Sequence, residues 1–243
     1  MLFNVCYISL MFYLITSSNG LKPRIFGGDE LQSQKHLVLL NIYTEQNELI
    51  KCSGSIIKPS YIISSAHCFE NPTRYVDVKH MTEGEVVNIA KVEGKNIKTH
   101  ENYLKEDENS TDLAILRTTK RIQFNKAVRP IKLYKDVFKV DQSQTAFIAG
   151  FGEHDEGEAG KIMTGGKVVV YRCPETTETA ICSKDGVVAA DGDSGGSLVS
   201  RNRLLGVTSA IAGCLEGVPC VTIYASIPAN MKWILRNIRD RLN

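Results

Sequence analysis

The segment from residue 191 to residue 196 combines a hydroxyl nucleophile with a turn of small residues. It reads Asp-Gly-Asp-Ser-Gly-Gly, with Ser194 in the fourth place. Because glycine lets the backbone turn sharply, the amides of Gly192 and Ser194 can converge on one oxygen atom and stabilise negative charge there. A serine in this setting is a candidate for nucleophilic attack on a carbonyl carbon, provided that a general base lies beside it.

The order of residues along the chain restricts which class of serine enzyme is compatible. Residues 192–196 also match the Gly-x-Ser-x-Gly nucleophile elbow, in which the catalytic His follows the Ser. All five His of this chain precede Ser194. The elbow interpretation therefore lacks a base in the required order.

His67 is the best candidate for the base. It ends the run Ile62-Ile63-Ser64-Ser65-Ala66 and precedes Cys68, which could form a disulfide with Cys52 and so clamp the loop. A lone His is more often structural than catalytic, but the other four lie in polar or loop contexts: His36, His80, His100 and His154. Asp112 heads the apolar run Leu113-Ala114-Ile115-Leu116 and is a candidate to orient the imidazole, the alternative being a capping or solvated carboxylate.

The elements that must position these residues are predicted to be short strands. Runs rich in Val, Ile, Leu and Tyr recur, separated by Gly, Pro, Asn or charged clusters, which favours an all-β barrel or sandwich. The predicted strands are Leu37–Tyr43, Ser55–Ile57, Tyr61–Ser64, Val86–Val92, Leu113–Arg117, Thr145–Ala149, Lys167–Tyr171, Leu204–Ser209 and Thr222–Ser226. Met231, Ile234, Leu235 and Ile238 have helical spacing and predict one amphipathic C-terminal helix. Glu101–Glu108 and Gly152–Gly166 are predicted to be exposed loops.

The N-terminus has the character of a targeting segment. Residues 1–20 carry no charge, are apolar from Val5 to Ile15 and then become small and polar, which predicts a signal peptide and secretion to the extracellular space. No second apolar run of about 18 residues follows, so no membrane anchor is expected. Lys and Arg are scattered and the net charge is only +2, which argues against nucleic acid as a partner.

Removal of a signal peptide would change the cysteine count from odd to even. Cys6 would be lost, and the six remaining cysteines suit an oxidising compartment: Cys52, Cys68, Cys173, Cys182, Cys214 and Cys220. Their spacing suggests pairing between sequence neighbours, although six cysteines allow fifteen pairings. The chain has neither a Cys-x-x-Cys pair nor a His-Glu-x-x-His run, so neither a metal nor another cofactor is expected.

Three motifs in the order His, Asp, Ser resemble the trypsin and chymotrypsin family of serine endopeptidases. They are Cys52-Ser53-Gly54-Ser55 leading to Ser65-Ala66-His67-Cys68, then residues 112–116, and then residues 192–196. The resemblance covers residues 24 to about 240. It implies two six-stranded antiparallel β-barrels with a C-terminal α-helix, hydrolysis of polypeptide substrates by a His67–Asp112–Ser194 triad, protein protease inhibitors as further partners, and a monomer.

A fourth motif resembles the activation site of this family. In Arg24-Ile25-Phe26-Gly27-Gly28, cleavage after Arg24 by an activating protease would free the α-amino group of Ile25, which the resemblance pairs with Asp193. The implied organisation is a signal peptide at 1–20, an activation propeptide at 21–24 and a protease domain at 25–243. Phe26 departs from the small Val that is usual at the second position.

The resemblance also places the residues that select the substrate. Val188 stands where trypsin-like members carry an Asp at the base of the specificity pocket, and Ile211 and Thr222 stand where wide pockets have Gly. A shallow, elastase-like pocket for small or apolar side chains is therefore expected. Ser209 matches the Ser that supports the catalytic Asp.

Two departures from the family leave an alternative open. Ala190 replaces a Cys that would normally pair with Cys214, so Cys214 is expected to pair with Cys220, and Ala210 replaces a Trp that shapes neighbouring subsites. Such changes occur in family members that have lost activity, so a secreted binding homologue with weak or no catalysis is the alternative. A sequon at Asn109 predicts N-glycosylation.

Overall fold

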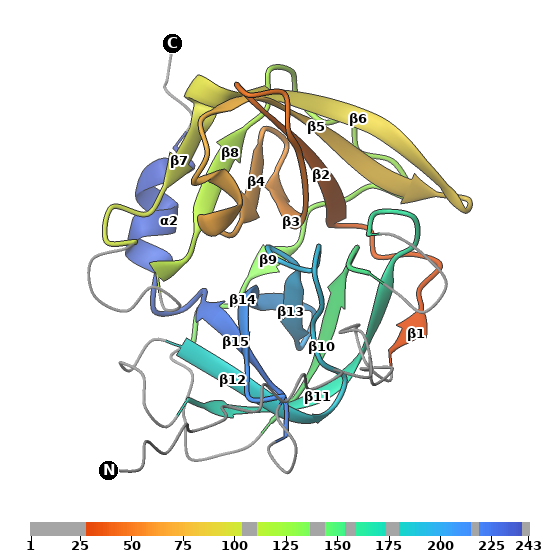
Figure 1. The fold of residues 1–243 in the computed structure, drawn as a ribbon, viewed down its shortest axis with the longest axis vertical. Coiled ribbons are helices and arrows are strands. Elements are labelled where there is room, and N and C mark those ends of the chain that lie inside the picture. Colours follow the sequence, from red (N-terminus) through yellow and green to blue (C-terminus); the bar gives the residue numbers. More distant parts are fainter. Residues whose placement is uncertain are drawn as a thin grey trace, which may run out of the picture.

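Two antiparallel β-sheets of successive chain halves form the body of the molecule (Figure 1). The computed structural model describes residues 28–103, 111–136, 144–153, 159–173, 180–214 and 219–239. The all-β class and the C-terminal helix, α2 (Met231–Asn237), are confirmed. None of the helices in these ranges is long and apolar enough to cross a membrane.

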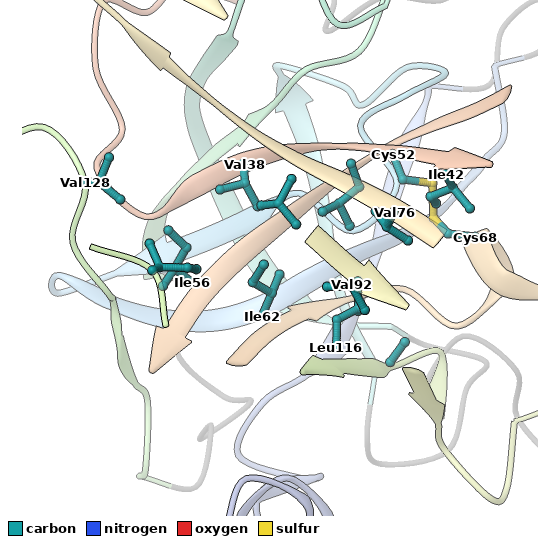
Figure 2. Packing of buried hydrophobic residues seen from close by; sticks show 14 residues of the cluster. Val38, Ile42, Cys52, Ile56, Ile62, Cys68, Val76, Val92, Leu116 and Val128 are labelled. Atoms are coloured by element: carbon teal, nitrogen blue, oxygen red, sulfur yellow. A yellow bond between two sulfur atoms is a disulfide. The ribbon is translucent and has the colours of Figure 1, made fainter. Parts of the chain in front are cut away.

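The N-terminal sheet has seven strands in the order β6-β5-β2-β3-β4-β8-β7. Their bounds are β2 Leu37–Thr44, β3 Leu49–Lys58, β4 Tyr61–Ser64, β5 Thr73–Thr82, β6 Glu85–Glu93, β7 Ile97–Thr99 and β8 Ala114–Arg117. The sheet curls around a buried cluster to which β2, β3, β4, β5, β6 and β8 contribute aliphatic side chains, as Figure 2 shows for Val38, Ile62 and Val76. Two short 3₁₀ turns, η1 (His67–Phe69) and η2 (Gly94–Asn96), connect its strands.

The C-terminal sheet closes on itself. Strand pairings run β10–β13–β14–β15–β12–β11 and back to β10, which makes a six-stranded barrel, while β1 pairs with β11 and β9 runs parallel to β14. The bounds are β1 Asp29–Glu30, β9 Lys132–Leu133, β10 Gln144–Gly150, β11 Thr164–Arg172, β12 Ala180–Gly186, β13 Ser197–Ser200, β14 Arg203–Ala212 and β15 Val221–Ser226. The expected pair of barrels is thus one closed barrel and one curled sheet, whose edge strands β6 and β7 are not paired with each other in the described residues.

Every strand predicted from the sequence lies within or overlaps an observed strand, but six strands were not predicted: β1, β5, β7, β9, β12 and β13. The clearest of these is β5, in which Asp77 and Lys79 alternate with the buried Val76, Val78 and His80 and conceal its apolar face. The prediction of an exposed loop over Gly152–Gly166 is wrong at its C-terminal end. Met163 is fully buried and β11 begins at Thr164, because the glycines there pack closely against β10 and its neighbours.

Helix α2 packs against the N-terminal sheet although it follows the C-terminal barrel in sequence. Ile234 and Ile238 are buried as predicted, in a cluster with Ile63 of β4 and Ile115 of β8. Leu235, assigned to the buried stripe from its spacing, is instead 47% exposed, and Trp233 is buried in its place. The helix thereby packs against the strand that precedes His67, β4, and the strand that follows Asp112, β8.

The three disulfides join neighbours in sequence: Cys52–Cys68, Cys173–Cys182 and Cys214–Cys220. The first ties β3 to η1, and its sulfur atoms are visible in Figure 2. Because His67 begins η1, this bridge anchors the turn that holds the imidazole.

Candidate active site

His67 and Asp112 form a hydrogen-bonded pair at one edge of the N-terminal sheet. His67 Nδ1 lies 2.7 Å from Asp112 Oδ2, and the backbone amide of His67 donates to Asp112 Oδ1 at 2.9 Å. Since a carboxylate only accepts, Nδ1 carries the proton and Nε2 is the basic nitrogen of the neutral ring. Two bonds from one residue to one carboxylate hold the imidazole in a single orientation.

A third donor completes the environment of Asp112. Ser209 Oγ donates to Asp112 Oδ2 at 2.6 Å, and the aspartate is only 2% exposed. A buried carboxylate needs such partners, because loss of hydration is costly to a charge. Ser209 lies on β14 of the barrel, so this bond also joins the two halves of the molecule.

The surroundings of His67 favour the protonated imidazole more than water does for a free histidine. Burial lowers the pKa of His67, but the hydrogen bond and the charge of Asp112, helped by the charge of Glu70, outweigh it, so the pKa is raised above its ordinary value. The ring is 31% exposed in its side chain and remains accessible. Such a group can take up a proton as a general base and later return it as a general acid.

The turn that carries Ser194 is fastened to the same strands. Ser53 of β3 donates its amide to the Ser194 carbonyl at 2.7 Å. The carbonyl of Thr208 accepts from Ser65 Oγ at 2.6 Å and from the amide of Gly195 at 2.9 Å, which links the segment before His67 to the residue after Ser194. No hydrogen bond joins His67 to Ser194 Oγ in the described residues.

The two amides on either side of the Asp193 amide, those of Gly192 and Ser194, are left without a partner in the described residues. The amides of Asp193, Gly195 and Gly196 donate to the carbonyls of Ala190, Thr208 and Asp193, respectively. The amides of Gly192 and Ser194 donate to no described residue, and Gly192 has a φ of +90°, which few residues other than glycine adopt. Paired free N–H groups of this kind can stabilise an oxyanion.

Ser53 belongs to the motif at residues 52–55, but nothing in the sequence indicates the role of its side chain. Its Oγ donates to the Gly192 carbonyl at 2.9 Å and accepts from the Phe151 amide at 2.9 Å. The peptide unit between Gly192 and Asp193 is thereby held at both ends, at its carbonyl by Ser53 and at its amide by Ala190. This unit separates the two free amides, so its orientation sets the direction of both.

Asp193 is buried beneath the turn. Burial raises the pKa of Asp193 to about 7, against the opposing effect of hydrogen bonds from the amides of Ala190 and Gly152. Gly152 leaves room for the carboxylate, because a Cβ on it would lie 2.4 Å from Asp193 Oδ2. The described residues offer this carboxylate no cation, whereas Arg24 and Ile25 lie outside them, as does Asn109.

A cavity of about 250 Å³ opens beside Ser194. Ala189, Ala190 and Asp191 line one side of it, and Thr208, Ser209, Ala210 and Ile211 line the other. Val188 and Thr222, which the sequence placed at the pocket, do not line it. Thr222 is fully buried and accepts the Ala189 amide through Oγ1 at 3.1 Å, so the alanine covers it.

Two of the other described histidines, His36 and His80, are buried and do not have the polar or loop settings expected from the sequence. His36 is 8% exposed and His80, on β5, is 1% exposed. Neither belongs to the cavity beside Ser194, and His154 lies outside the described residues. No three His, Cys, Asp or Glu side chains in the described ranges are grouped as metal ligands would be.

Comparisons with known proteins agree with this architecture. Trypsin 5G1 of Aedes aegypti is 25% identical over 205 residues, which cover 75% of this chain and 73% of that protein. HL collagenase matches in structure with a TM-score of 0.73 at 23% identity, over 86% of this chain and 96% of its own. An inactivated protease paralogue of the scabies mite, S-I1, matches with a TM-score of 0.70 at 18% identity, over 87% and 98% of the two chains.

The two structural neighbours establish the fold, and the family comparison covers most of the sequence. The model of the family described as Trypsin matches residues 25–234, a range that includes the His67–Asp112 pair, the Ser194 turn and the cavity beside it. The chain therefore belongs to the trypsin family of serine proteases.

Proposed function

We propose that this protein is a secreted serine endopeptidase that cleaves after small or apolar residues. The observation that carries the proposal is the His67–Asp112 hydrogen bond, set beside a serine turn with two unpaired amides. An orienting carboxylate, a base, a nucleophile and oxyanion donors are the parts that acyl transfer requires.

In the proposed reaction, Ser194 Oγ attacks the carbonyl carbon of the scissile peptide bond as His67 Nε2 takes the hydroxyl proton. Asp112 stabilises the imidazolium, and the amides of Gly192 and Ser194 bind the oxyanion. His67 then protonates the amine as the C–N bond breaks, which leaves an acyl ester on Ser194. Water, deprotonated by His67, attacks this ester and regenerates the serine.

Activation is proposed to supply the positively charged partner that the Asp193 carboxylate lacks among the described residues. Residues 1–20 are assigned as a signal peptide and 21–24 as a propeptide, with cleavage after Arg24 by another protease. The new α-amino group of Ile25 would pair with the buried Asp193 carboxylate, and the raised pKa of this group supports the need for a cation. Glycosylation at Asn109 belongs to the same assignment of a secreted protein.

The preference for small residues follows from the cavity beside Ser194. Its walls present the methyl groups of Ala189, Ala190 and Ala210 and the side chain of Ile211. Asp191 is the one acidic residue that lines this cavity. Its side chain is exposed, so water screens its charge, and the charge is not buried at the base of the cavity. A substrate Lys or Arg would therefore lose hydration without gaining a buried partner.

Active-site labelling tests the function directly. Protein cleaved at Arg24 should react with a fluorophosphonate at one site, and the uncleaved chain should react much more slowly. The same Arg24-cleaved protein, not treated with fluorophosphonate, should cut a peptide library after Ala or Val. Preference for Arg would refute the assigned specificity, and a cleaved, folded protein that never labels would favour the inactive binding homologue instead.

Replacement of Ser53 by alanine should lower kcat about tenfold with little change in KM, because loss of a positioning hydrogen bond costs about 1 to 2 kcal/mol. The Gly192 carbonyl and the Phe151 amide would both lose their partner, so the two oxyanion amides would be less well aligned. Steady-state kinetics on an Ala- or Val-containing peptide substrate measure the effect.

Ser55→Ala is the matched control, since Ser55 lies two residues further along β3, is fully buried and has no partner for its hydroxyl in the described residues. This variant should keep the wild-type kcat. Equal losses in both variants, or a change confined to KM in Ser53→Ala, would contradict a positioning role for Ser53.

A further inference from the structure

A second, larger cavity of about 560 Å³ lies at the junction of the two sheets. Residues 33–36, which lead into β2, form one wall, and residues 129–132, which lead into and include part of β9, form another. Val199 of β13 completes the apolar part of its lining. No residue of this cavity belongs to the one beside Ser194.

The walls are held together by backbone hydrogen bonds. The amide of Arg129 donates to the Lys35 carbonyl at 2.8 Å, and the amide of Ile131 donates to the Ile56 carbonyl at 2.9 Å. In Figure 1, β9 lies between the two sheets, which places this segment where both halves contribute. The site is therefore built into the framework, at the kind of junction where ligand sites recur.

Three cationic side chains line this cavity, and no acidic one does. They are Lys35, Arg129 and Lys132, and each is exposed and takes part in no ion pair with another described residue. Arg203 is the direct neighbour of Lys132 in the parallel pairing of β14 with β9, which adds a fourth positive charge. Cations grouped without counterions create a field that attracts anionic ligands.

The lining of the cavity is not uniformly polar. Pro130, Ile131 and Val199 supply apolar surface between the cations. His36 lines the cavity too. It is 8% exposed, and its Nε2 has no hydrogen-bond partner in the described residues. Burial and the nearby His80 lower the pKa of His36 to about 4, so it is a neutral polar group and not a fourth lining cation.

We propose that this cavity, called here the junction groove, binds an acidic polypeptide segment that places an apolar side chain between its carboxylates. The carboxylates would meet Lys35, Arg129 and Lys132, and the apolar side chain would cover Pro130, Ile131 and Val199. The apolar lining favours a peptide over a sulfated polysaccharide or nucleic acid, because a polyanion has charge in excess and no aliphatic anchor. The proposal does not depend on the proposed peptidase activity.

Binding of a fluorescein-labelled Glu-Asp-Glu-Leu-Glu-Asp-Glu peptide, measured by fluorescence anisotropy, tests this proposal. The protein is the full chain carrying Ser194→Ala, which prevents hydrolysis of the peptide. The double variant Arg129→Glu/Lys132→Glu should weaken binding about tenfold or more, because each attraction becomes a repulsion. Lys120→Glu/Arg121→Glu makes the same change of net charge at exposed residues that do not line the groove. It should weaken binding less than about twofold at 0.15 M salt, because exposed charges that do not contact the peptide are largely screened.

Two altered probes decide the nature of the ligand. A peptide with Gln and Asn in place of Glu and Asp should not bind, and a peptide with Ser in place of Leu should bind more weakly. Equal losses in the two double variants would overturn the assignment of the site to the groove. Undiminished binding of the Ser peptide would overturn the peptide assignment in favour of a polyanion, and thermal unfolding curves verify that every variant is folded.

Discussion

Replacing Ser194 with alanine is expected to lower kcat by about 10⁵- to 10⁶-fold while substrate binding is retained. The reason is that attack on the carbonyl and formation of the acyl ester require the hydroxyl, whereas the other two hydroxyl side chains that line the cavity, Thr208 and Ser209, are buried. Residual turnover should come only from binding and from the amides of Gly192 and Ser194. Burst and steady-state kinetics of Arg24-cleaved protein on an Ala- or Val-containing peptide ester measure the loss.

Ser60→Ala provides the control for this experiment. Ser60 lies in the turn between β3 and β4, where its carbonyl accepts the Thr118 amide, so its side chain can be truncated without altering that bond. The control should keep both the turnover rate and fluorophosphonate labelling. Wild-type turnover in Ser194→Ala would show that the nucleophile has been misassigned.

Asp112→Asn should lower kcat about 10⁴-fold at neutral pH. The amide can no longer stabilise an imidazolium, and it can present its NH₂ group to His67, which would favour the wrong tautomer. The fold should tolerate the change, because the amide oxygen still accepts from the His67 amide or from Ser209. Single-turnover kinetics across a range of pH separate the chemical step from binding.

The same variant should move the acid limb of the pH profile. His67 acts as a base only when neutral, so kcat/KM rises as pH increases through its pKa, which Asp112 raises against the effect of burial. Without the carboxylate the pKa should fall, and residual activity should persist to lower pH. Glu70→Gln removes only the weakest of these raising effects, so it should shift the limb slightly and leave kcat nearly unchanged. An acid limb that does not move in Asp112→Asn would contradict the pairing.

Much of the candidate site could be inferred from short segments of the sequence. His67, Asp112 and Ser194 each occur in a recognisable local pattern, and their order excluded the nucleophile elbow. The strands were found where apolar residues are contiguous or alternate clearly. They were missed where charged residues interrupt the pattern, as in β5, because one exposed face can conceal the other.

Positions that depend on how strands face one another could not be inferred in this way. The resemblance placed Val188 and Thr222 at the substrate pocket, but neither residue lines the cavity beside Ser194, and the Thr222 hydroxyl is buried where it accepts the Ala189 amide. The hydroxyl of Ser53 acquires its role only because the turn at Gly192 is folded onto β3. Burial of His36 and His80 was likewise hidden by their polar neighbours in sequence.

The distribution of charged residues shows most clearly what the sequence determines and what the tertiary structure determines. The sequence alone determined the motifs of a serine protease and a net charge of +2 with no basic run, because these are properties of linear order and composition. Only the tertiary structure decided that Lys35, Arg129 and Lys132 share one groove, since the Lys35 carbonyl pairs with the Arg129 amide across nearly a hundred residues of chain. Long-range hydrogen bonding brings scattered cations together, and sequence spacing carries no record of that contact.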